Sequence, residues 1–511
     1  MSFEVFAEAL GIVFSWPTIG WVVAGIIIGI IVGALPGLGA SLGMAILLPL
    51  TFQLDGVSAI VLLISIYSGA MYGGAIAAIL LNAPGTSAAA ATTFDGYPMS
   101  RKGQAVTALS MSATASALAG FLTIATLIIL SPVLIEIVLM FGSPEYFLIA
   151  ILGLAMITVV ARGSIVKGLI AGFFGLALTT IGSAPMTGDN RYTFGQFALY
   201  DGVDFVAALI GLFAVAEMMK LANERGGISR RGFDVTGDIL PGIRAVFRHP
   251  ITFLKSAYIG MGIGAIPGAG STVSTFVAYT EAVRSSKDSE SFGDGNEVGV
   301  IAAEASNNGT IGGSIIPAIS FGIPGSAATA VLIGGLIMHG LNPGPDLFSA
   351  DANLNVTYAM FIALFVGNIL ILVLGLSLIT RAGMLTKIDS DYIIPMILVL
   401  SFLGAFALNN GRWVDVITIV GLGVIGFYMK RYDYSIIAFV LGVVLGEIAE
   451  ENLFRSLILD RDSNLTIGER VYDVPIFINP VEQPISFLLV AAIVLILAAP
   501  VIKPWIDERR G

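Results

Sequence analysis

The chain has no cysteine and only two histidines among its 511 residues, and charged residues make up just 12% of it. The absence of cysteine excludes disulfides, thiol nucleophiles and thiolate metal sites. His249 and His339 fit no metal-ligand spacing, and the sequence contains no His-Glu-x-x-His motif, phosphate-binding loop or nucleophile elbow. We therefore expect neither an enzyme nor a resident cofactor.

The shortage of charge also limits the partners. The net charge is −10 and is spread over short loops, so no basic surface for nucleic acid is present. Hydrophobic residues make up 56% of the chain, and the mean hydropathy is +0.92. Long apolar runs of this kind predict an all-α polytopic protein of the cell (inner or plasma) membrane, with about 10–14 membrane elements, some of them broken or re-entrant.

One hydrophilic stretch divides the chain. Residues 222–250 contain Arg225, Arg230, Arg231, Arg244 and Arg248, which the positive-inside rule places in the cytoplasm. We expect a membrane half one at 1–221, this cytoplasmic connecting segment, and a membrane half two at 251–456. An extracytoplasmic loop at 457–484 and a C-terminal membrane helix and tail at 485–511 complete the predicted organisation.

The two halves carry the same pair of Pro-Gly breaks. Residues 33–37 match 264–268, residues 73–76 match 312–315, and residues 84–86 match 324–326 after one inserted residue. The loop after the second break of half one carries Arg101 and Lys102, whereas its counterpart in half two carries Asp346 and Asp351. Because basic loops mark the cytoplasmic side, this change of sign predicts two repeats of opposite orientation.

Each break places glycine and hydroxyl residues ahead of a predicted helix start. Pro and Gly end a membrane helix, and an open backbone in the membrane requires protein or water around it. A helix N-terminus offers unpaired N–H groups and a partial positive charge, which suit an anion. The alternative is that the breaks merely kink packed helices. The predicted substrate-binding residues are Gly37, Gly39, Ser41, Asn82, Gly85, Thr86, Ser87, Gly268, Gly270, Ser271, Gly325 and Ser326.

A second polar group lies inside the apolar stretch 298–323. Glu304, Asn307 and Asn308 share one helical face, and Thr310 follows them. Ionisable groups within a membrane predict function, and these oxygens suit Na⁺, while the carboxylate alone could carry a proton. The pattern equally allows Glu304 at the membrane interface and amides that join helices. The alignment gives Ser65, Ser68 and Gly69 as the half-one equivalents.

Two further polar groups have structural interpretations. Asp95 with Gly96, Tyr97 and Pro98 reads as a tight cytoplasmic turn, and the alternative is that Asp95 caps a helix or binds a ligand. The stretch 450–452 with Arg455 predicts a helix-end ion pair or a partner contact.

Several long motifs resemble the large membrane subunit (TctA) of tripartite tricarboxylate transporters. They are Gly33–Gly39, Tyr72–Thr86, Asp95–Pro98, Lys102–Ala105, Gly264–Gly268, Phe292–Gly295, Glu304–Asn308, Gly322–Ser326, Asn342–Pro345 and Glu450–Ser456. The resemblance implies uptake of citrate or a related small carboxylate, driven by an ion gradient without ATP. It also implies a small membrane subunit and an extracytoplasmic solute-binding protein as partners.

The residues themselves leave other functions open. A stand-alone carboxylate–cation symporter would show the same breaks. A channel is disfavoured because four breaks suit a gated site better than a continuous pore. A membrane enzyme or assembly factor would need a polar catalytic cluster, which the sequence lacks.

Overall fold

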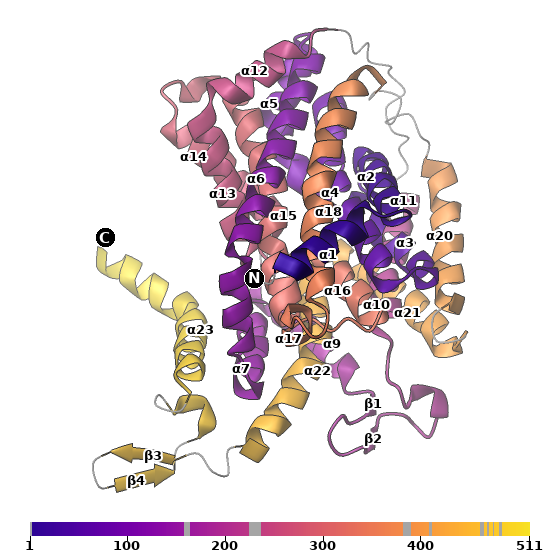
Figure 1. Ribbon diagram of the computed structural model, residues 1–511, viewed down its shortest axis with the longest axis vertical. Coiled ribbons are helices and arrows are strands. Elements are labelled where there is room, and N and C mark those ends of the chain that lie inside the picture. The colour runs from indigo at the N-terminus through magenta and orange to yellow at the C-terminus, as the bar shows by residue number, and fades with distance from the viewer. Residues whose placement is uncertain are drawn as a thin grey trace.

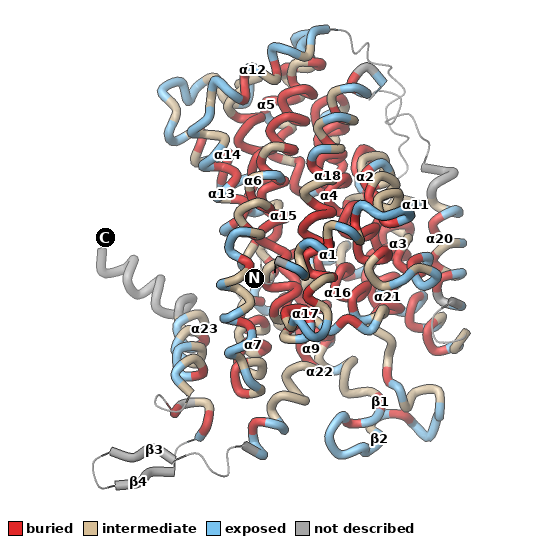
Figure 2. Tube along the Cα trace, in the orientation of Figure 1, coloured by how far each residue is buried: buried red, intermediate tan, exposed pale blue. Residues whose placement is uncertain are grey.

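The computed structural model describes residues 3–157, 164–223, 237–381, 390–407, 411–459, 464–467, 470–473, 475–479 and 483–510 (Figure 1). Helices form nearly all of the regular structure in these ranges. The buried residues follow the middle of the helical bundle, while exposed ones lie on its outer faces and connections (Figure 2). The predicted all-α fold is confirmed.

Half one begins with a bent pair of helices and ends with a helix that contains a π-helical turn. Its helices are α1 (Phe3–Phe14), α2 (Thr18–Ala34), α3 (Gly39–Leu47), η1 (Leu48–Gln53), α4 (Gly56–Leu81), η2 (Ser87–Ala90), α5 (Thr93–Arg101), α6 (Ala105–Leu139), α7 (Ser143–Ala155), α9 (Ile165–Thr179), η3 (Phe197–Leu199), α10 (Phe205–Leu209), η4 (Ile210–Val215) and α11 (Ala216–Asn223). A short antiparallel hairpin pairs β1 (Gly182–Ser183) with β2 (Asn190–Arg191).

Half two repeats the pattern of a broken helix followed by a long buried one. Its helices are α13 (Pro250–Gly264), α14 (Gly270–Ser285), η5 (Ser289–Ser291), α15 (Glu297–Phe321), α16 (Ala327–Met338), α17 (Pro345–Phe348), α18 (Leu354–Ser377), η6 (Ile379–Arg381), α20 (Ser390–Ala407), α21 (Trp413–Arg431) and α22 (Ile436–Leu459), and α12 (Leu240–Arg248) precedes them in the connecting segment. The hairpin β3 (Asn464–Ile467) and β4 (Arg470–Asp473), η9 (Ile476–Ile478) and α23 (Pro484–Arg510) follow.

Among the described residues, five helices are long and apolar enough to cross a membrane: Gly56–Leu81, Ala105–Leu139, Phe205–Asn223, Leu354–Ser377 and Trp413–Arg431. A sixth span is possible if α1 and α2, which are bent by 67° at their break, count as one. Shorter apolar helices include α7, α9 and α16. Long spans mixed with short apolar helices match the expected mixture of complete and broken elements.

The two ends of the bundle carry different loops. In Figure 1, α5 and α12 lie at one end, and the β1–β2 and β3–β4 hairpins lie at the other. The predicted cytoplasmic arginines Arg225, Arg230 and Arg231 lie outside the described residues. The cytoplasmic position of 222–250 and the external position of 457–484 stay predictions.

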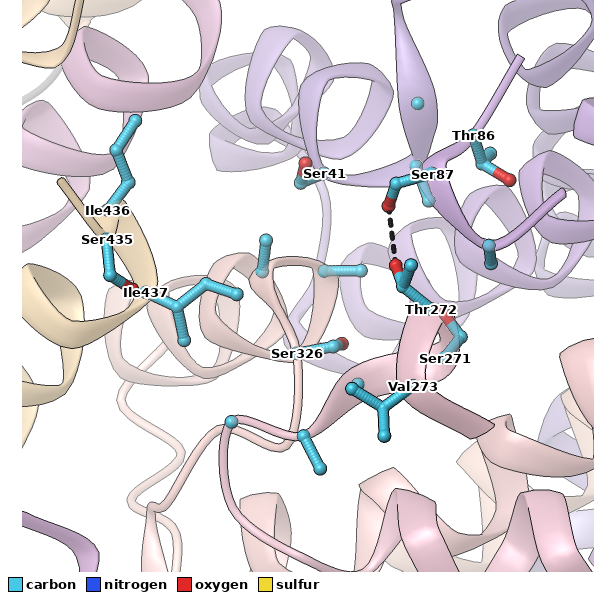
Figure 3. A pocket seen from close by; sticks show the side chains of 18 of the residues that line it. Ser41, Thr86, Ser87, Ser271, Thr272, Val273, Ser326, Ser435, Ile436 and Ile437 are labelled. Carbon is cyan, nitrogen blue, oxygen red and sulfur yellow. Dashed lines mark hydrogen bonds between the residues drawn. The ribbon is translucent and has the colours of Figure 1, made fainter. Parts of the chain in front are cut away.

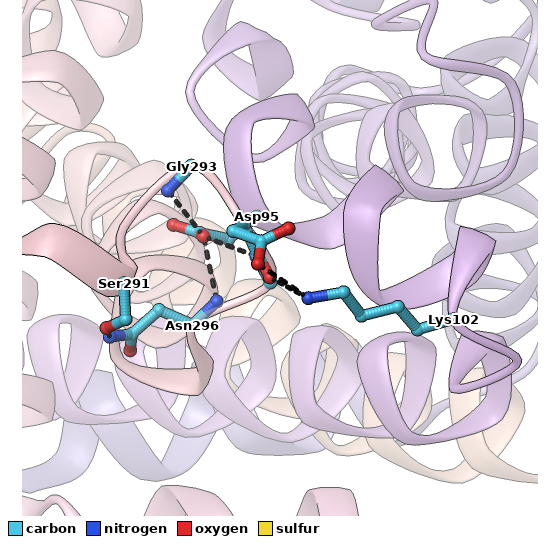
Figure 4. Close-up of polar contacts among 7 residues, drawn as sticks. Asp95, Lys102, Ser291, Gly293 and Asn296 are labelled. Carbon is cyan, nitrogen blue, oxygen red and sulfur yellow. Dashed lines mark hydrogen bonds and ion pairs between the residues drawn. The ribbon is translucent and has the colours of Figure 1, made fainter.

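Asp95 is not in a tight turn, as the sequence pattern suggested, but in the helix α5. Its buried carboxylate reaches the loop before α15, where Oδ1 accepts from the backbone N–H groups of Gly293, Gly295 and Asn296 at 2.8–3.0 Å (Figure 4). Its Oδ2 accepts from the Tyr279 hydroxyl at 2.8 Å. The aspartate therefore joins half one to half two, a role that a local sequence pattern does not reveal.

The predicted helix-end ion pair at the end of α22 is confirmed. Arg455 pairs with Glu451 one turn away on the same helix. Glu450 instead accepts two hydrogen bonds from Arg191 on β2, at 2.6 and 3.0 Å. This pair holds the β1–β2 hairpin against α22 and raises the pKa of Arg191 above its usual value.

The same close packing of two helices occurs within each half. Gly33 lies against Ala70, where an added Cβ would come within 2.3 Å of the carbonyl oxygen. Gly264 lies in the same way against Thr310, at 2.5 Å. Two further pairs of contacts follow the same offsets in residue number: Gly69 against Ile26 with Gly309 against Ala257, and Gly73 against Ile30 with Gly313 against Met261. The α2–α4 pair therefore packs like the α13–α15 pair.

These contacts correct the alignment of the two halves by one residue. They pair Gly73 with Gly313, whereas the sequence match paired it with Gly312. One residue turns a side chain by about 100° around a helix, so the slip changes which positions are comparable. The half-one equivalents of Glu304, Asn307 and Asn308 become Ile64, Tyr67 and Ser68, in place of Ser65, Ser68 and Gly69.

Candidate functional site

The first break of each half depends on two glycines in a left-handed conformation. Gly37 and Gly39 follow α2 with φ of +85° and +68°, and Gly268 and Gly270 follow α13 with φ of +71° and +65°. Other residue types rarely adopt such angles, so glycine is required to turn the chain here. After each turn a new helix starts, α3 in half one and α14 in half two.

The second breaks also match. Asn82 ends α4 at φ +56° and Gly322 ends α15 at φ +68°, both in the left-handed cap conformation. Beyond them the chain turns back into a new helical segment whose N-terminus is capped by a hydroxyl. Thr86 accepts from the Ala89 N–H at 3.3 Å, and Ser326 accepts from the Thr329 N–H at 3.2 Å. The Pro-Gly steps therefore end one helix and start another, as predicted.

Gly85 and Gly325 bring the two breaks of each half together. A Cβ on Gly85 would lie 1.8 Å from the carbonyl oxygen of Gly33, and a Cβ on Gly325 would lie 2.8 Å from that of Gly264. No side chain fits such a distance without a shift of the backbone. Both glycines therefore have a packing role that accounts for them without a ligand.

The N-termini of four helical segments, two from each half, line one cavity of about 1270 Å³. The segments are α3, η2, α14 and α16. Figure 3 shows their hydroxyl residues around the open space, including Ser41, Ser87, Ser271 and Ser326. Ligand pockets are commonly about 300–1,000 Å³, so this one has room for a small molecule together with water.

Most of the predicted substrate residues lie on this cavity. The wall includes Gly39, Ser41, Thr86, Ser87, Gly268, Gly270, Ser271 and Ser326. The remaining four, Gly37, Asn82, Gly85 and Gly325, shape the breaks behind it. The structure thus brings all four breaks to one place, while the binding of substrate by these residues stays a prediction.

Three lysines on the wall were missed by the sequence analysis as site residues. Lys167, Lys220 and Lys430 lie at helix ends around the cavity, together with Glu217 and Asp433. Glu217 forms ion pairs with Lys220 and Lys430. Nothing local in the sequence shows that these ends meet, because α9, α11 and α21 are far apart along the chain.

Lys167 is held beside the cavity by its own contacts. Its Nζ donates to the Tyr432 carbonyl at 2.8 Å and lies 5.5 Å from the ring centre of Tyr434. Three lysines against two carboxylates leave the wall with a positive excess. Together with the partial positive charge of helix N-termini, this makes the cavity favourable for an anion.

Glu304 lies outside the cavity wall, in the interior between α15 and α6. It is fully buried, which disfavours the alternative of an interfacial position. Its carboxylate accepts from Ser116 at 2.8 Å, from Ser112 at 3.1 Å and from Thr92. A buried acidic group inside a membrane segment is expected to have a function, because its burial is costly.

The other predicted cation residues separate into two kinds. Asn307 donates to the carbonyl of Met71 at 3.0 Å, and Thr310 donates to the Ser306 carbonyl at 2.7 Å. These contacts join or stabilise helices. In contrast, neither side-chain polar atom of Asn308 has a hydrogen-bond partner among the described residues. Cation binding by any of the four stays a prediction.

Comparison with known proteins identifies the chain. The model of the tripartite tricarboxylate transporter TctA family matches residues 19–441, which include all four breaks. The chain belongs to the TctA family. The resemblance seen in the sequence is confirmed. Membership of this transport family and the several helices that could span a membrane identify this TctA-family chain as a multi-pass membrane protein.

The relatives of this TctA-family chain carry little functional description. An uncharacterized 52.8 kDa protein in the TAR-I ttuC′ 3′ region of Agrobacterium vitis is 33% identical over 468 residues, covering 89% of this chain and 88% of the relative. An uncharacterized protein in the TAR-II ttuC′ 3′ region of the same organism is 29% identical over 239 residues, covering 47% of this chain and 93% of the relative. No solved structure matches the chain.

Proposed function

We propose that the chain is the large membrane subunit of a secondary transporter that takes up citrate, another tricarboxylate or a related carboxylate by symport with Na⁺ or H⁺. The observation that supports this most directly is the meeting of the N-termini of α3, α14 and α16 with the short turn η2 around one cavity. Backbone N–H groups and hydroxyls there offer donors for carboxylate oxygens, and the lysines add positive charge. No catalytic activity is part of this proposal.

The partners in this proposal follow from the family. TctA proteins belong to tripartite transporters, so a small membrane subunit and an extracytoplasmic solute-binding protein are expected. We place the complex in the inner or plasma membrane. A stand-alone symporter without a binding protein is the competing arrangement, and it predicts uptake by the chain alone.

Uptake into membrane vesicles tests the proposal. Vesicles with the chain and the small subunit are given radiolabelled mono-, di- and tricarboxylates, with and without a Na⁺ gradient, a pH gradient and the binding protein. We expect accumulation of at least one carboxylate against its gradient, and none of an uncharged polyol of similar size. The absence of carboxylate accumulation with all components present would contradict the proposal.

The two repeats have opposite orientations in our proposal, so equivalent loops face opposite sides of the membrane. Because the natural chain has no cysteine, single cysteines report sidedness without background. A cysteine in place of Lys102 should react with a membrane-impermeant thiol reagent only from the cytoplasmic side. A cysteine in place of Asp351 should react only from the outside. Labelling of both from one side would rule out the inverted arrangement.

A further inference from the structure

Three buried asparagines, Asn307, Asn308 and Asn368, have amide oxygens without a hydrogen-bond partner among the described residues. Asn308 on α15 is fully buried, and neither its Oδ1 nor its Nδ2 is bonded. Asn368 on α18 is 2% exposed, its Nδ2 donates to the Leu364 carbonyl at 2.8 Å, and its Oδ1 has no partner. A buried polar group left in this way destabilises the fold, so the amide oxygens of Asn308 and Asn368 point to a ligand.

Asn368 lies directly against α6. A Cβ added to Gly120 would be 2.1 Å from the Oδ1 of Asn368. Only glycine at this point of α6 leaves room for the amide. The amide oxygen is therefore held at the level of residue 120.

Asn308 faces α6 at the same level. Glu304, Asn308 and Gly312 follow one another at four-residue spacing and lie on one face of α15. Glu304 is bonded to Ser112 and Ser116 of α6, and a Cβ on Gly312 would lie 3.0 Å from the Thr123 hydroxyl. The residue between them therefore faces α6 between positions 116 and 123, where Gly120 lies.

The charge in this region also needs a counterpart. The contacts of the Glu304 carboxylate are three hydroxyl donors, and among the described residues no basic side chain forms an ion pair with it. A buried carboxylate in a membrane needs a proton or a cation. A proton would neutralise Glu304 but would leave the oxygens of Asn308 and Asn368 without partners. A cation accounts for all three groups.

We propose that Asn308 Oδ1 and Asn368 Oδ1 bind a Na⁺ ion beside Gly120 and that Glu304 supplies the compensating negative charge. Carbonyl-type oxygens and a nearby carboxylate are the environment that a hard cation prefers. None of these residues lines the cavity that we propose for the carboxylate substrate, so Na⁺ and the substrate have separate sites. The role of Na⁺ as the coupling ion rests on the proposed function. The sequence pattern placed all predicted cation ligands on one helix, whereas this site also includes Asn368 from α18.

A Na⁺ ion that binds the folded state but not the unfolded state should stabilise the protein against unfolding. The full-length chain, purified with the subunits that remain bound, is heated in increasing NaCl, with choline chloride keeping the ionic strength constant. We expect the wild-type Tm to rise with Na⁺. Asn308→Ala and Asn368→Ala should each raise the half-effective Na⁺ concentration at least tenfold. Gly120→Ala should do the same, since the added Cβ displaces the amide.

Matched variants separate loss of a ligand from loss of packing. Asn355→Ala on the same helix α18 removes a half-buried amide that donates to Glu8 at the protein surface, and it should keep the wild-type Na⁺ response. Asn368→Asp retains an oxygen at the same position and should also keep a Na⁺ response. Superimposable Na⁺ curves for the wild type and Asn368→Ala would overturn the proposal. So would a wild-type Tm that depends on pH but not on Na⁺.

The same measurement is independent of carboxylate transport. A Na⁺ response that Asn368→Ala removes, together with no carboxylate uptake in vesicles, would keep the ion site and reject the proposed substrate. Carboxylate uptake without any Na⁺ stabilisation would keep the transporter and reject the ion site.

Discussion

The side chains of Ser87 and Thr272 are hydrogen-bonded, with their hydroxyl oxygens 2.9 Å apart (Figure 3). Ser87 follows the second break of half one, whereas Thr272 follows the first break of half two. Both residues line the cavity, so the bond joins the two halves at the surface that we propose for substrate. A movement of one half against the other during transport would have to break or reposition this contact.

Removal of either hydroxyl should weaken carboxylate binding. We expect Ser87→Ala and Thr272→Val each to raise the half-saturating substrate concentration about fivefold, equivalent to roughly 1 kcal/mol for one hydrogen bond. Because the two hydroxyls act as a pair, the double variant should be little worse than either single one. Vesicle uptake at a series of carboxylate concentrations measures this. Effects that multiply in the double variant would show that the hydroxyls act independently, and Thr126→Val on α6 serves as the hydroxyl-loss control outside the cavity.

Substitution at Gly85 should be more harmful than substitution at Gly325. An added Cβ would lie 1.8 Å from a backbone oxygen at Gly85 but 2.8 Å at Gly325, so only the first requires a large backbone shift. We expect Gly85→Ala to lower the Tm by several degrees more than Gly325→Ala and to abolish uptake. Gly262→Ala on α13, where an added Cβ meets no atom within 4 Å, should behave as wild type. Equal Tm values for the Gly85 and Gly325 variants would contradict the packing argument.

The positive excess of the cavity can be tested at Lys167. Lys167→Gln keeps most of the side-chain length but removes the charge beside the proposed anion site. We expect the half-saturating carboxylate concentration to rise about tenfold, or roughly 1.4 kcal/mol, and to depend less on ionic strength than in the wild type. Lys287→Gln, which changes an exposed lysine outside the cavity wall, is the control. Unchanged substrate affinity would show that backbone and hydroxyls alone hold the anion.

The Asp95 contact should contribute strongly to stability. Asp95→Ala would leave three backbone N–H groups and the Tyr279 hydroxyl without their acceptor, at a cost of about 3 kcal/mol or more. Thermal unfolding and proteolysis of the segment 286–296 would measure the effect. Asp294 lies in the same loop, and Asp294→Ala removes only its exposed ion pair with Lys102. This variant should lower the free energy of unfolding by less than about 1 kcal/mol. Comparable losses in the two variants would mean that the buried carboxylate is not the main link.

The breaks and the candidate anion site were largely predictable from the sequence. Pro-Gly steps in apolar stretches have few alternatives, because a missing N–H group and a left-handed glycine both end a helix. The equivalence of Gly33–Gly37 and Gly264–Gly268 followed from the sequence alone. The alignment of α4 with α15 could not be predicted in the same way. Small apolar residues recur so often in both helices that shifting the alignment by one residue changes the sequence match little. Only the contacts of Gly73 and Gly313 decided it.

The sequence by itself determined the membrane class, the break positions, the hydroxyl and glycine character of the helix starts, and the unusual acidic residue at Glu304. These features depend on local chemistry, which a linear pattern retains. The tertiary structure alone decided that four helix starts share one cavity, that Lys167 and Lys430 border it, and that Asn368 lies beside Gly120. Such relationships arise where helices distant in the chain pack together, and the spacing of residues within one helix carries no information about which side chains a neighbouring helix brings to it.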